Sequence, residues 1–338
     1  VRILQTMVRR RPIRSAKIPN TSPPKAPQNT ALPAPGPGPT QEPKQESKPE
    51  IEAKPEPGPG LQLDFESASA PRVEQSDPGS DWSSLQSNLE LSGAAREFAR
   101  GEFDKELALE LDRNHEFPTK IWKKACDLGF VGVHFPEEYS GQGLGVLENI
   151  IIADEFCARD SSIGAAVILS SFASECVLRF GSEELKEKFL PPVVEGQMLS
   201  AGAFTEPGHG SDITSLDTTA VMEGDQWIIN GTKTFITNGG MAGFYCTMCQ
   251  TDSEVQPSYR GISLILVEAD REGLTTADVG EKMGIRMMPT AEVHYKDVRV
   301  PAANLIGEEG KGFYQVLEFF DESRILVAAQ ALGTAQGA

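Results

Sequence analysis

The segment that most limits how this chain can fold is the loop at residues 203–215, where an apolar run ends abruptly. Residues 198–204 predict a strand, and Thr205, Glu206 and Pro207 then start a turn that leads to two glycines flanking a single residue. A strand that ends in such a loop offers free backbone N–H groups and hydroxyls at one spot, which suits a ligand with phosphates or a polar ring edge. A Gly-x-Gly turn alone is weak evidence, because most such turns only reverse the chain.

A second informative segment follows about twenty residues later. The pair Asn230-Gly231 predicts a tight type I′ turn between two strands, because it is favoured in two-residue hairpins. Since side chains alternate along a strand, Lys233, Phe235 and Thr237 are expected to share one face of the second strand. The ring of Phe235 can then pack against a flat heterocycle, and the hydroxyl of Thr237 can form a hydrogen bond with the edge of that heterocycle. The alternative is an ordinary sandwich strand with a half-buried Phe.

Together these segments resemble the acyl-CoA dehydrogenase family, the FAD-dependent enzymes that desaturate acyl thioesters. The Thr-Glu-Pro-Gly-x-Gly-Ser-Asp run at 205–212 is similar to the family's first signature. Phe235-Ile236-Thr237-Asn238-Gly239 is similar to its Trp-Ile-Thr-Asn-Gly segment, with Phe in place of Trp. Five further stretches similar to the family follow its order along the chain, at 136–143, 181–191, 283–286, 298–301 and 305–313. The resemblance runs from about residue 83 to residue 338.

The residue pattern and the resemblance predict an α+β fold, acyl-CoA dehydrogenase-like, with three domains. Residues 83–197 are expected to form an N-terminal helical domain with long buried helices at 146–157 and 162–179. Residues 198–305 carry many short strand signals separated by turns, which indicate a middle β-barrel or sandwich domain. Residues 306–338 turn helical again and are expected to be the first helix of a C-terminal helical bundle.

The first 80 residues differ from the rest in composition. Prolines crowd residues 12–59 and aromatic residues are almost absent, so this segment cannot bury enough apolar area to offset the entropy of ordering. We expect a disordered Pro-rich linker with polyproline character. Its first 25 residues hold seven Lys or Arg and no acid, which is typical of a transit peptide. A hinge from an upstream domain is an alternative, and the interpretation that we favour is an unselected tail or upstream extension.

Charge and hydrophobic patterning exclude two kinds of partner. The first 80 residues carry 11 of the 31 basic and 9 of the 49 acidic side chains, so the remainder carries 20 basic and 40 acidic ones. Such an acidic body argues against nucleic-acid binding. The sequence has no run of about 18 apolar residues, so no membrane span is predicted.

The cysteines and histidines indicate a reducing compartment and no metal site. Five cysteines form no even disulfide framework, which fits the cytoplasm, or the mitochondrial matrix if the protein is eukaryotic. Cys246 and Cys249 lie three residues apart in an expected strand, so their sulfurs should face opposite sides and metal binding is not expected. The four histidines show no ligand spacing, and we interpret His209 as a surface turn residue.

The resemblance implies FAD as the cofactor and an acyl-CoA thioester as the substrate. It assigns contacts with the flavin to Phe204, Thr205, Gly210, Ser211, Phe235, Ile236 and Thr237. Thr205 and its loop neighbours would bond the pyrimidine edge, and Thr237 would lie near N5. Ser211, on the CoA side of the loop, would contact the substrate together with Asp321 and Arg324. An ordinary i, i+3 ion pair on a helix is the alternative for Asp321 and Arg324, and both can hold at once.

Desaturation of a thioester also needs a carboxylate that removes the α-proton, while the β-hydride goes to flavin N5. The family places this base directly before the arginine, which here is Ser323, or far into the C-terminal bundle. Glu322 is rotated by roughly 100° from Ser323 around the helix and is expected to point elsewhere. We therefore expect the base beyond residue 338 and expect this stretch of chain alone to be inactive.

The resemblance further implies an electron-transfer flavoprotein as the electron acceptor and assembly into a homo-oligomer, a dimer or tetramer. A non-catalytic flavin- or CoA-binding remnant is one alternative. A flavin oxidase or monooxygenase on the same fold is another. The length of the acyl chain is not predicted.

Overall fold

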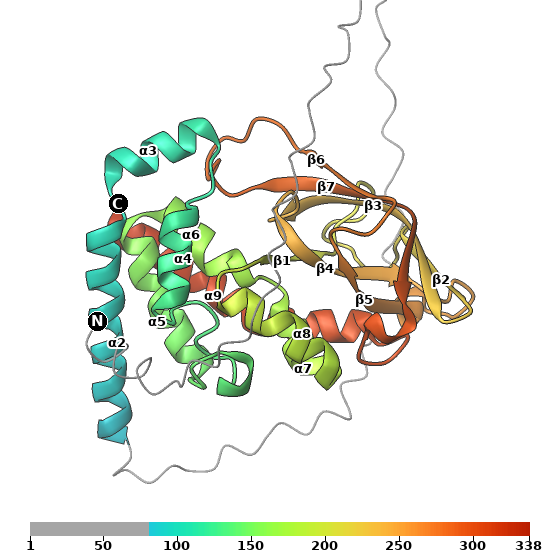
Figure 1. The fold of residues 1–338 in the computed structure, drawn as a ribbon, viewed down its shortest axis with the longest axis horizontal. Coiled ribbons are helices and arrows are strands. Elements are labelled where there is room, and N and C mark those ends of the chain that lie inside the picture. Colours follow the sequence, from blue (N-terminus) through green and yellow to red (C-terminus); the bar gives the residue numbers. More distant parts are fainter. Residues whose placement is uncertain (1–80) are drawn as a thin grey trace, which may run out of the picture. The chain divides into compact units, whose positions relative to one another are not determined.

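The computed structural model describes residues 81–338, so the predicted Pro-rich linker at residues 1–80 lies outside the described part of the chain. Within that part, helices come first, a mainly antiparallel sheet follows, and one long helix comes last (Figure 1). This order confirms the expected α+β architecture.

Several helices of the helical part begin with a side-chain cap. The carboxylate of Asp104 accepts the Leu107 N–H at 3.0 Å, and that of Asp160 accepts the Ile163 N–H at 2.8 Å, as expected of N-cap residues. The helices are α2 (Asp81–Glu102), α3 (Lys105–Asn114), α4 (Thr119–Asp127), α5 (Val146–Arg159), α6 (Ser161–Ile168), α7 (Ser174–Phe180) and α8 (Glu183–Val194), with the 3-10 turns η1 (Glu137–Tyr139) and η2 (Leu169–Ser171).

A cluster of aromatic rings fills the helical core. Phe98 contacts Phe103, Phe130 and Phe156 at ring-centroid distances of 5.1–5.9 Å, and all four side chains are buried. Edge-to-face and tilted contacts of this kind stabilise a core beyond the area they bury. The cluster fixes α2 against α5, which carries Phe156.

The apolar helix expected at residues 162–179 is not continuous. α6 ends at Ile168, η2 follows, and α7 begins only after Ala173 adopts a left-handed backbone with φ of 70°. That backbone region interrupts a right-handed helix. Among the described residues, Ser161–Phe180 has the length and composition to cross a membrane, but 67% of its apolar window is buried. A core helix of a soluble protein passes the same test, so this is weak evidence for a span.

The sheet has the strand order β6-β7-β3-β2-β4-β5-β8, and β1 pairs with β4 in parallel. Its strands are β1 (Leu199–Ala203), β2 (Thr219–Glu223), β3 (Gln226–Thr237), β4 (Ala242–Gln250), β5 (Ile262–Glu268), β6 (Leu274–Asp278), β7 (Thr290–Pro301) and β8 (Leu305–Ile306), with the 3-10 turns η3 (Ser258–Gly261) and η4 (Ala302–Asn304). One face packs on helices, where Phe244 meets Phe189 of α8 at a centroid distance of 5.0 Å. The other face forms a second cluster around Trp227 and Tyr245.

The two neighbouring cysteines of β4 lie on opposite faces of this sheet, which confirms the prediction. Cys246 is in the cluster that faces the helices, and its Sγ lies 3.4 Å from the Ala173 carbonyl. Cys249 is in the cluster on the other face. Burial raises the pKa of both thiols, that of Cys249 to about 12, so neither is poised to act as a thiolate.

The hairpin predicted at Asn230-Gly231 is wrong, because β3 runs through this pair as one strand. The ladder between β3 and β7 shifts register here, which marks a bulge. Gly231 has φ of 150°, and a Cβ there would lie 2.4 Å from Thr218 Oγ1, so only glycine fits this close approach. The Asn230 side chain bonds Asp297 of β7, donating from Nδ2 at 3.2 Å and accepting the Asp297 N–H at 2.9 Å. Pairing with β7 thus takes the place of a turn.

A second register shift in β3 also corrects the expected alternation of side chains. The shift lies between Lys233 and Ile236, where Phe235 has a left-handed φ of 56°. Lys233 is therefore fully buried while Phe235 is 68% exposed, so these two side chains do not share a face. The bulge turns Phe235 outward.

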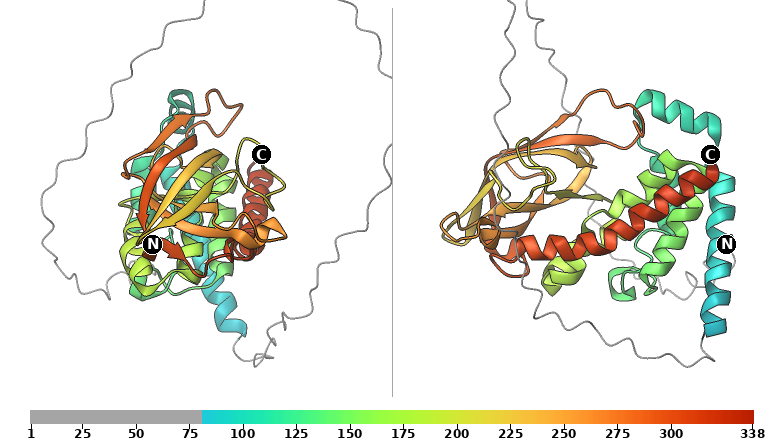
Figure 2. Two further views of the ribbon diagram at one scale, coloured as in Figure 1. Left: turned by 90° about the vertical axis from the view of Figure 1, so that its right-hand side faces the viewer. Right: turned by 180° about the vertical axis from the view of Figure 1, so that it is seen from behind.

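The last helix, α9 (Gly312–Gly337), runs from the sheet to the helical part (Figure 2). Near its start Val316 and Phe319 are buried in the cluster between sheet and helices. Near its end a Cβ on Gly333 would lie 2.3 Å from the Asp154 carbonyl, so the backbones of α9 and α5 touch. α9 therefore ties the two parts of the described chain together.

Candidate functional site

Segments far apart in the sequence meet around one hollow of about 350 Å³. They are the end of η2, the loop after β1, the end of β3 and the middle of α9. The hollow is lined by Phe172, Gly202, Phe204, Thr205, Gly210, Ser211, Ile213, Phe235, Ile236, Thr237 and Phe320. All seven residues predicted to contact a flavin are among them. The structure thus brings together two motifs that lie about twenty residues apart.

The lining combines one exposed aromatic ring with hydroxyl groups. Phe235 has 68% of its surface exposed, which is unusual for a ring of this size. Thr205 and Thr237 are half-buried and Ser211 is exposed, so the hollow offers hydroxyl donors and acceptors beside the ring. This set can hold a flat heterocycle by its face and its polar edge at once.

A buried ion pair fixes the loop that carries Thr205. Lys233 Nζ donates to Glu206 Oε1 at 2.7 Å and to the Phe204 carbonyl at 3.2 Å, and both charged side chains are almost fully buried. Burial alone would raise the pKa of Glu206, but Lys233 and backbone N–H donors outweigh it and hold that pKa below 4.5. Burial lowers the pKa of Lys233, against the attraction of Glu206. The pair locks β3 to the loop at the point where Thr205 enters the hollow.

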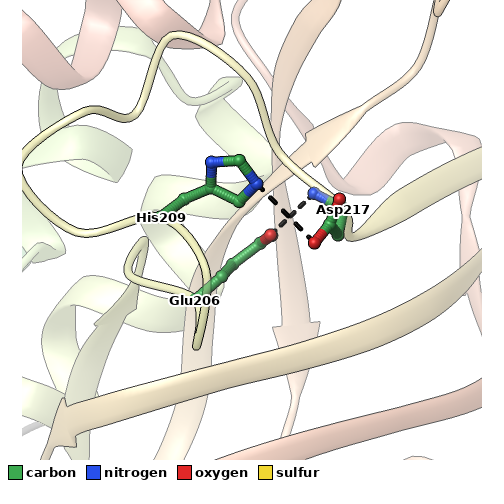
Figure 3. Close-up of side chains that lie close together, drawn as sticks. All are labelled: Glu206, His209 and Asp217. Atoms are coloured by element: carbon green, nitrogen blue, oxygen red, sulfur yellow. Dashed lines mark hydrogen bonds and ion pairs between the residues drawn. The ribbon is translucent and has the colours of Figure 1, made fainter. Parts of the chain in front are cut away.

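Glu206 also holds the far end of the loop, where it meets two other possible metal ligands (Figure 3). Its oxygens accept the Asp217 N–H at 2.6 Å and the Thr218 N–H at 3.0 Å. His209 Nε2 lies 3.6 Å from Asp217 Oδ2, and one ligand atom from each of Glu206, His209 and Asp217 lies within 4.8 Å of the others. Both oxygens of Glu206 already accept hydrogen bonds, and Lys233 balances its charge. The geometry therefore favours a hydrogen-bond network that holds the loop closed, rather than a site for a cation.

Backbone and amide hydrogen bonds position the other half of the hollow. The Thr234 N–H donates to the Thr205 carbonyl at 2.9 Å, which joins β3 to the loop directly. Next to Thr237, the buried Asn238 donates from Nδ2 to the Leu169 carbonyl at 2.8 Å and to the Ser200 carbonyl at 2.9 Å. Its left-handed φ of 64° suits asparagine. Asn238 thereby anchors the edge of the hollow to η2 and β1.

Of the three residues predicted to contact the substrate, one lines the hollow. Ser211 lines the hollow, whereas Asp321 and Arg324 do not. They lie on an exposed turn of α9, where Arg324 Nη2 is 3.1 Å from Asp321 Oδ1. Arg324 Nε also donates to the carbonyl of Phe320, which does line the hollow, at 2.9 Å. The i, i+3 ion pair is therefore present, one turn away from the hollow.

Glu322 and Ser323 line a separate, smaller cavity of about 20 Å³ between α5, η2, α7 and α9. Glu322 forms an ion pair with Arg179 of α7, so its carboxylate is turned toward that helix. Neither residue lines the hollow. Among the described residues no carboxylate lines the hollow.

Sequence reasoning missed four residues of the hollow. Phe172 follows η2, Phe320 lies in α9, and Ile213 follows the glycine loop. Gly202 is in β1, where a Cβ would lie 2.6 Å from the Phe204 ring. Phe172 and Phe320 reach the hollow only through packing of η2 and α9 against the sheet, so no local signal marks them.

Comparison with known proteins establishes the family. Residues 86–197 match the family model of the acyl-CoA dehydrogenase N-terminal domain, and residues 201–298 match that of the middle domain. The chain belongs to the acyl-CoA dehydrogenase family. This confirms the resemblance that the motifs at residues 205–212 and 235–239 indicated.

Three relatives show the extent of the similarity. The short-chain specific acyl-CoA dehydrogenase of Clostridium acetobutylicum is 41% identical over 246 residues, which cover 72% of this chain and 64% of that protein. Acryloyl-CoA reductase (NADH) of Anaerotignum propionicum is 40% identical over 250 residues, covering 73% and 63%. The structure of a glutaryl-CoA dehydrogenase from Mycobacterium smegmatis in complex with FADH2 has a TM-score of 0.68 and 28% identity, covering 75% and 63%. The chain spans less than two thirds of the length of these relatives.

Proposed function

We propose that the protein catalyses FAD-dependent α,β-dehydrogenation of an acyl-CoA thioester and passes the electrons to an electron-transfer flavoprotein. The observation that supports this proposal is the hollow, because all seven residues expected to contact a flavin are among those that line it. The family of the chain and a relative's structure with FADH2 support the choice of cofactor.

The residues of the hollow fit a flavin ring. Phe235 and Ile236 contribute apolar surface to the hollow, and Thr205 and Thr237 line the same hollow. A Cβ added to Gly210 would meet no atom within 4 Å, so a ligand can approach the backbone of the loop. When bound there, FAD would supply the acceptor for the β-hydride.

The chain's own residues would orient the reactants and exclude water. Phe235 and Ile236 restrain the ring from one side, while the two threonines fix its rotation by hydrogen bonds. Because Glu206–Lys233 and Asn238 hold these segments in place before any ligand binds, little ordering is needed on binding. Phe172, Phe204 and Phe320 close the remaining side with aromatic surface.

For the thioester we propose contacts with Ser211, Asp321 and Arg324. Ser211 lies in the hollow, and Arg324 projects from the turn of α9 that follows Phe320. The Arg324 side chain is 65% exposed, so its guanidinium is accessible to the anionic groups of CoA. We propose that the carboxylate that removes the α-proton is not among the described residues that line the hollow. Assembly into a dimer or tetramer is part of the same proposal.

A second candidate function is a flavin- or CoA-binding protein without catalysis. The specific observation in its favour is that no carboxylate lines the hollow within residues 81–338. Binding and orientation need only the groups already present, whereas proton abstraction needs a base.

One experiment separates these possibilities. The full-length gene product is titrated with FAD, and acyl-CoA thioesters of graded length are then added without oxygen while the visible flavin absorbance is followed. Stoichiometric FAD binding with loss of absorbance on adding a thioester supports the dehydrogenase. Binding without any loss of absorbance supports the non-catalytic protein. Absence of FAD binding overturns the dehydrogenase and the flavin-binding form of the second candidate.

A further inference from the structure

The loop between β6 and β7, residues 279–289, reaches from the edge of the hollow to the C-terminal end of α3 (Figure 1). At the sheet, Thr290 pairs with Thr237, which lines the hollow. The Pro289 carbonyl accepts the N–H of Asn238, the residue after Thr237, at 2.8 Å. The position of Thr237 is therefore linked directly to the last residues of this loop.

The far side of the loop is held by Asp112, in the last turn of α3. Its Oδ1 accepts the backbone N–H of Arg286 at 2.9 Å, and its Oδ2 accepts Arg286 Nη1 at 2.7 Å. Arg286 also donates from Nε to the Lys282 carbonyl at 2.9 Å and from Nη2 to the Met283 carbonyl at 3.1 Å, so its guanidinium closes the loop on itself. Beside it, Met287 is 1% exposed and packs in the helical core. Charge-assisted bonds at two points fix both the distance and the orientation of the loop.

The two partners in this contact have local costs that their own elements do not explain. A carboxylate in the last turn of a helix faces the negative end of the helix dipole, and Asp112 occupies such a position in α3. Ile285, next to Arg286, has a left-handed φ of 50°, which is strained for a β-branched residue. Strain of this kind persists only where the surrounding structure holds it, and it gathers at functional sites. These costs indicate that the position of the loop matters for function.

Lys282 connects the fixed part of the loop with the sheet. Its Nζ donates to the Ile285 carbonyl at 2.8 Å, to the Met288 carbonyl, and to Thr290 Oγ1 at 3.2 Å. Burial lowers the pKa of Lys282, against the attraction of Asp278 and Asp112. One ammonium group thus bonds the strained turn, the end of the loop and the first residue of β7.

We propose that Asp112, Arg286 and Lys282 are positioning residues for the cofactor, which set the place of Thr237 at the edge of the hollow. This inference rests on the proposed function and adds residues outside the site to it. None of the three lines the hollow, so they act through the hydrogen bonds that join the loop and β7 to the end of β3. A threonine held in place before FAD binds costs less to order on binding.

Asp112→Ala is the variant that removes this support most cleanly. Alanine is the best helix former, so α3 itself is not weakened by the substitution. We expect the dissociation constant for FAD to rise about 3- to 10-fold, the size that corresponds to ordering one contact side chain on binding. Asp112→Asn keeps an oxygen that can accept the Arg286 N–H, so its effect should be intermediate.

The matched control is Glu223→Ala. It breaks the ion pair with Arg299, which lies near the opposite end of β7 from Thr290, at 3.2 Å between Arg299 Nη2 and Glu223 Oε2. Both substitutions therefore remove a carboxylate that pairs with an arginine of the sheet domain. Only the one at Asp112 should reach Thr237.

The first measurement is hydrogen–deuterium exchange of the full-length gene product without FAD. Asp112→Ala should speed exchange in peptides that cover residues 279–290 and 234–239, while Glu223→Ala should leave residues 234–239 as in the wild type. Unchanged exchange at residues 234–239 in Asp112→Ala overturns the proposal, because the loop then does not hold Thr237.

The second measurement is the FAD titration of the same proteins, repeated in a Thr237→Val background. The loss of affinity caused by Asp112→Ala should shrink when Thr237 has no hydroxyl to position. An unchanged FAD affinity in Asp112→Ala, or an equal loss in both backgrounds, overturns the positioning role even if exchange has changed. If the wild type binds no FAD, the proposed function fails and this inference fails with it, whereas normal binding by wild type and Asp112→Ala alike overturns only the inference.

Discussion

The buried pair of Lys233 and Glu206 allows a quantitative prediction about both stability and the site. Lys233→Met removes the positive charge of the pair. Glu206, whose side chain is only 1% exposed, then keeps its negative charge with backbone N–H groups as its remaining donors. Breaking a buried ion pair from one side costs about 3–5 kcal/mol. At about 2–4 °C per kcal/mol for a domain of this size, the melting temperature should fall by roughly 6–20 °C.

The assay is urea unfolding of wild type, Lys233→Met, Glu206→Gln and the double variant, followed by tryptophan fluorescence. Trp227, buried at the start of the same strand, reports on this region. Because the double variant leaves no unpaired charge, it should lose less free energy of unfolding than the sum of the single variants. Losses below about 1 kcal/mol in both single variants, or strict additivity, would refute the reasoning.

The pair also predicts a dependence on pH. The pKa of Glu206 is held below its ordinary value of 4.5 in the folded protein. The contribution of Glu206 to the free energy of unfolding is therefore complete above pH 4.5 and is lost as the pH falls through the depressed pKa. Wild type should therefore lose stability more steeply below pH 4.5 than Glu206→Gln does. Parallel acid unfolding curves for the two proteins would contradict this.

The remaining predictions concern the hollow and its supports. Phe235→Ala should weaken FAD binding about 5- to 10-fold in calorimetry while the urea midpoint stays within error, since an exposed ring contributes little to folding. Asn238→Asp removes both amide donors and should lower the free energy of unfolding by about 2–5 kcal/mol, measured by urea titration; a loss near zero would mean that the bonds to Leu169 and Ser200 are dispensable. Gly231→Ala should cost about 2 kcal/mol or more because of its φ and the contact with Thr218, whereas Gly240→Ala, with no atom near the new Cβ, should be nearly neutral. Similar unfolding midpoints for the two alanine variants would show that the bulge does not require glycine at position 231.

Sequence reasoning reached the class of fold and the two motifs that meet in the hollow, because both depend on local patterns. The apolar runs before Thr205 and along β4 are short and bounded by turn residues, which favours buried strands. The fourteen-residue helix α5 likewise follows from its apolar pattern and the glutamate at its start.

Sequence reasoning failed where tertiary contacts decide the backbone. An Asn-Gly pair can close a hairpin or form a bulge, and only pairing with β7 selects the bulge at Gly231. Phe235 adopts a left-handed backbone that no propensity predicts for a bulky residue, so the burial of Lys233 was not foreseen.

The claim on which this account depends is that the loop at residues 203–215 and the end of β3 form the flavin site. Hydrogen–deuterium exchange of the protein with and without saturating FAD tests it most directly. The account predicts new protection in peptides that cover residues 204–213 and 234–239, with little change in the distant helix α3 (Lys105–Asn114). Protection confined to other segments, with these two peptides unchanged at saturation, would contradict it.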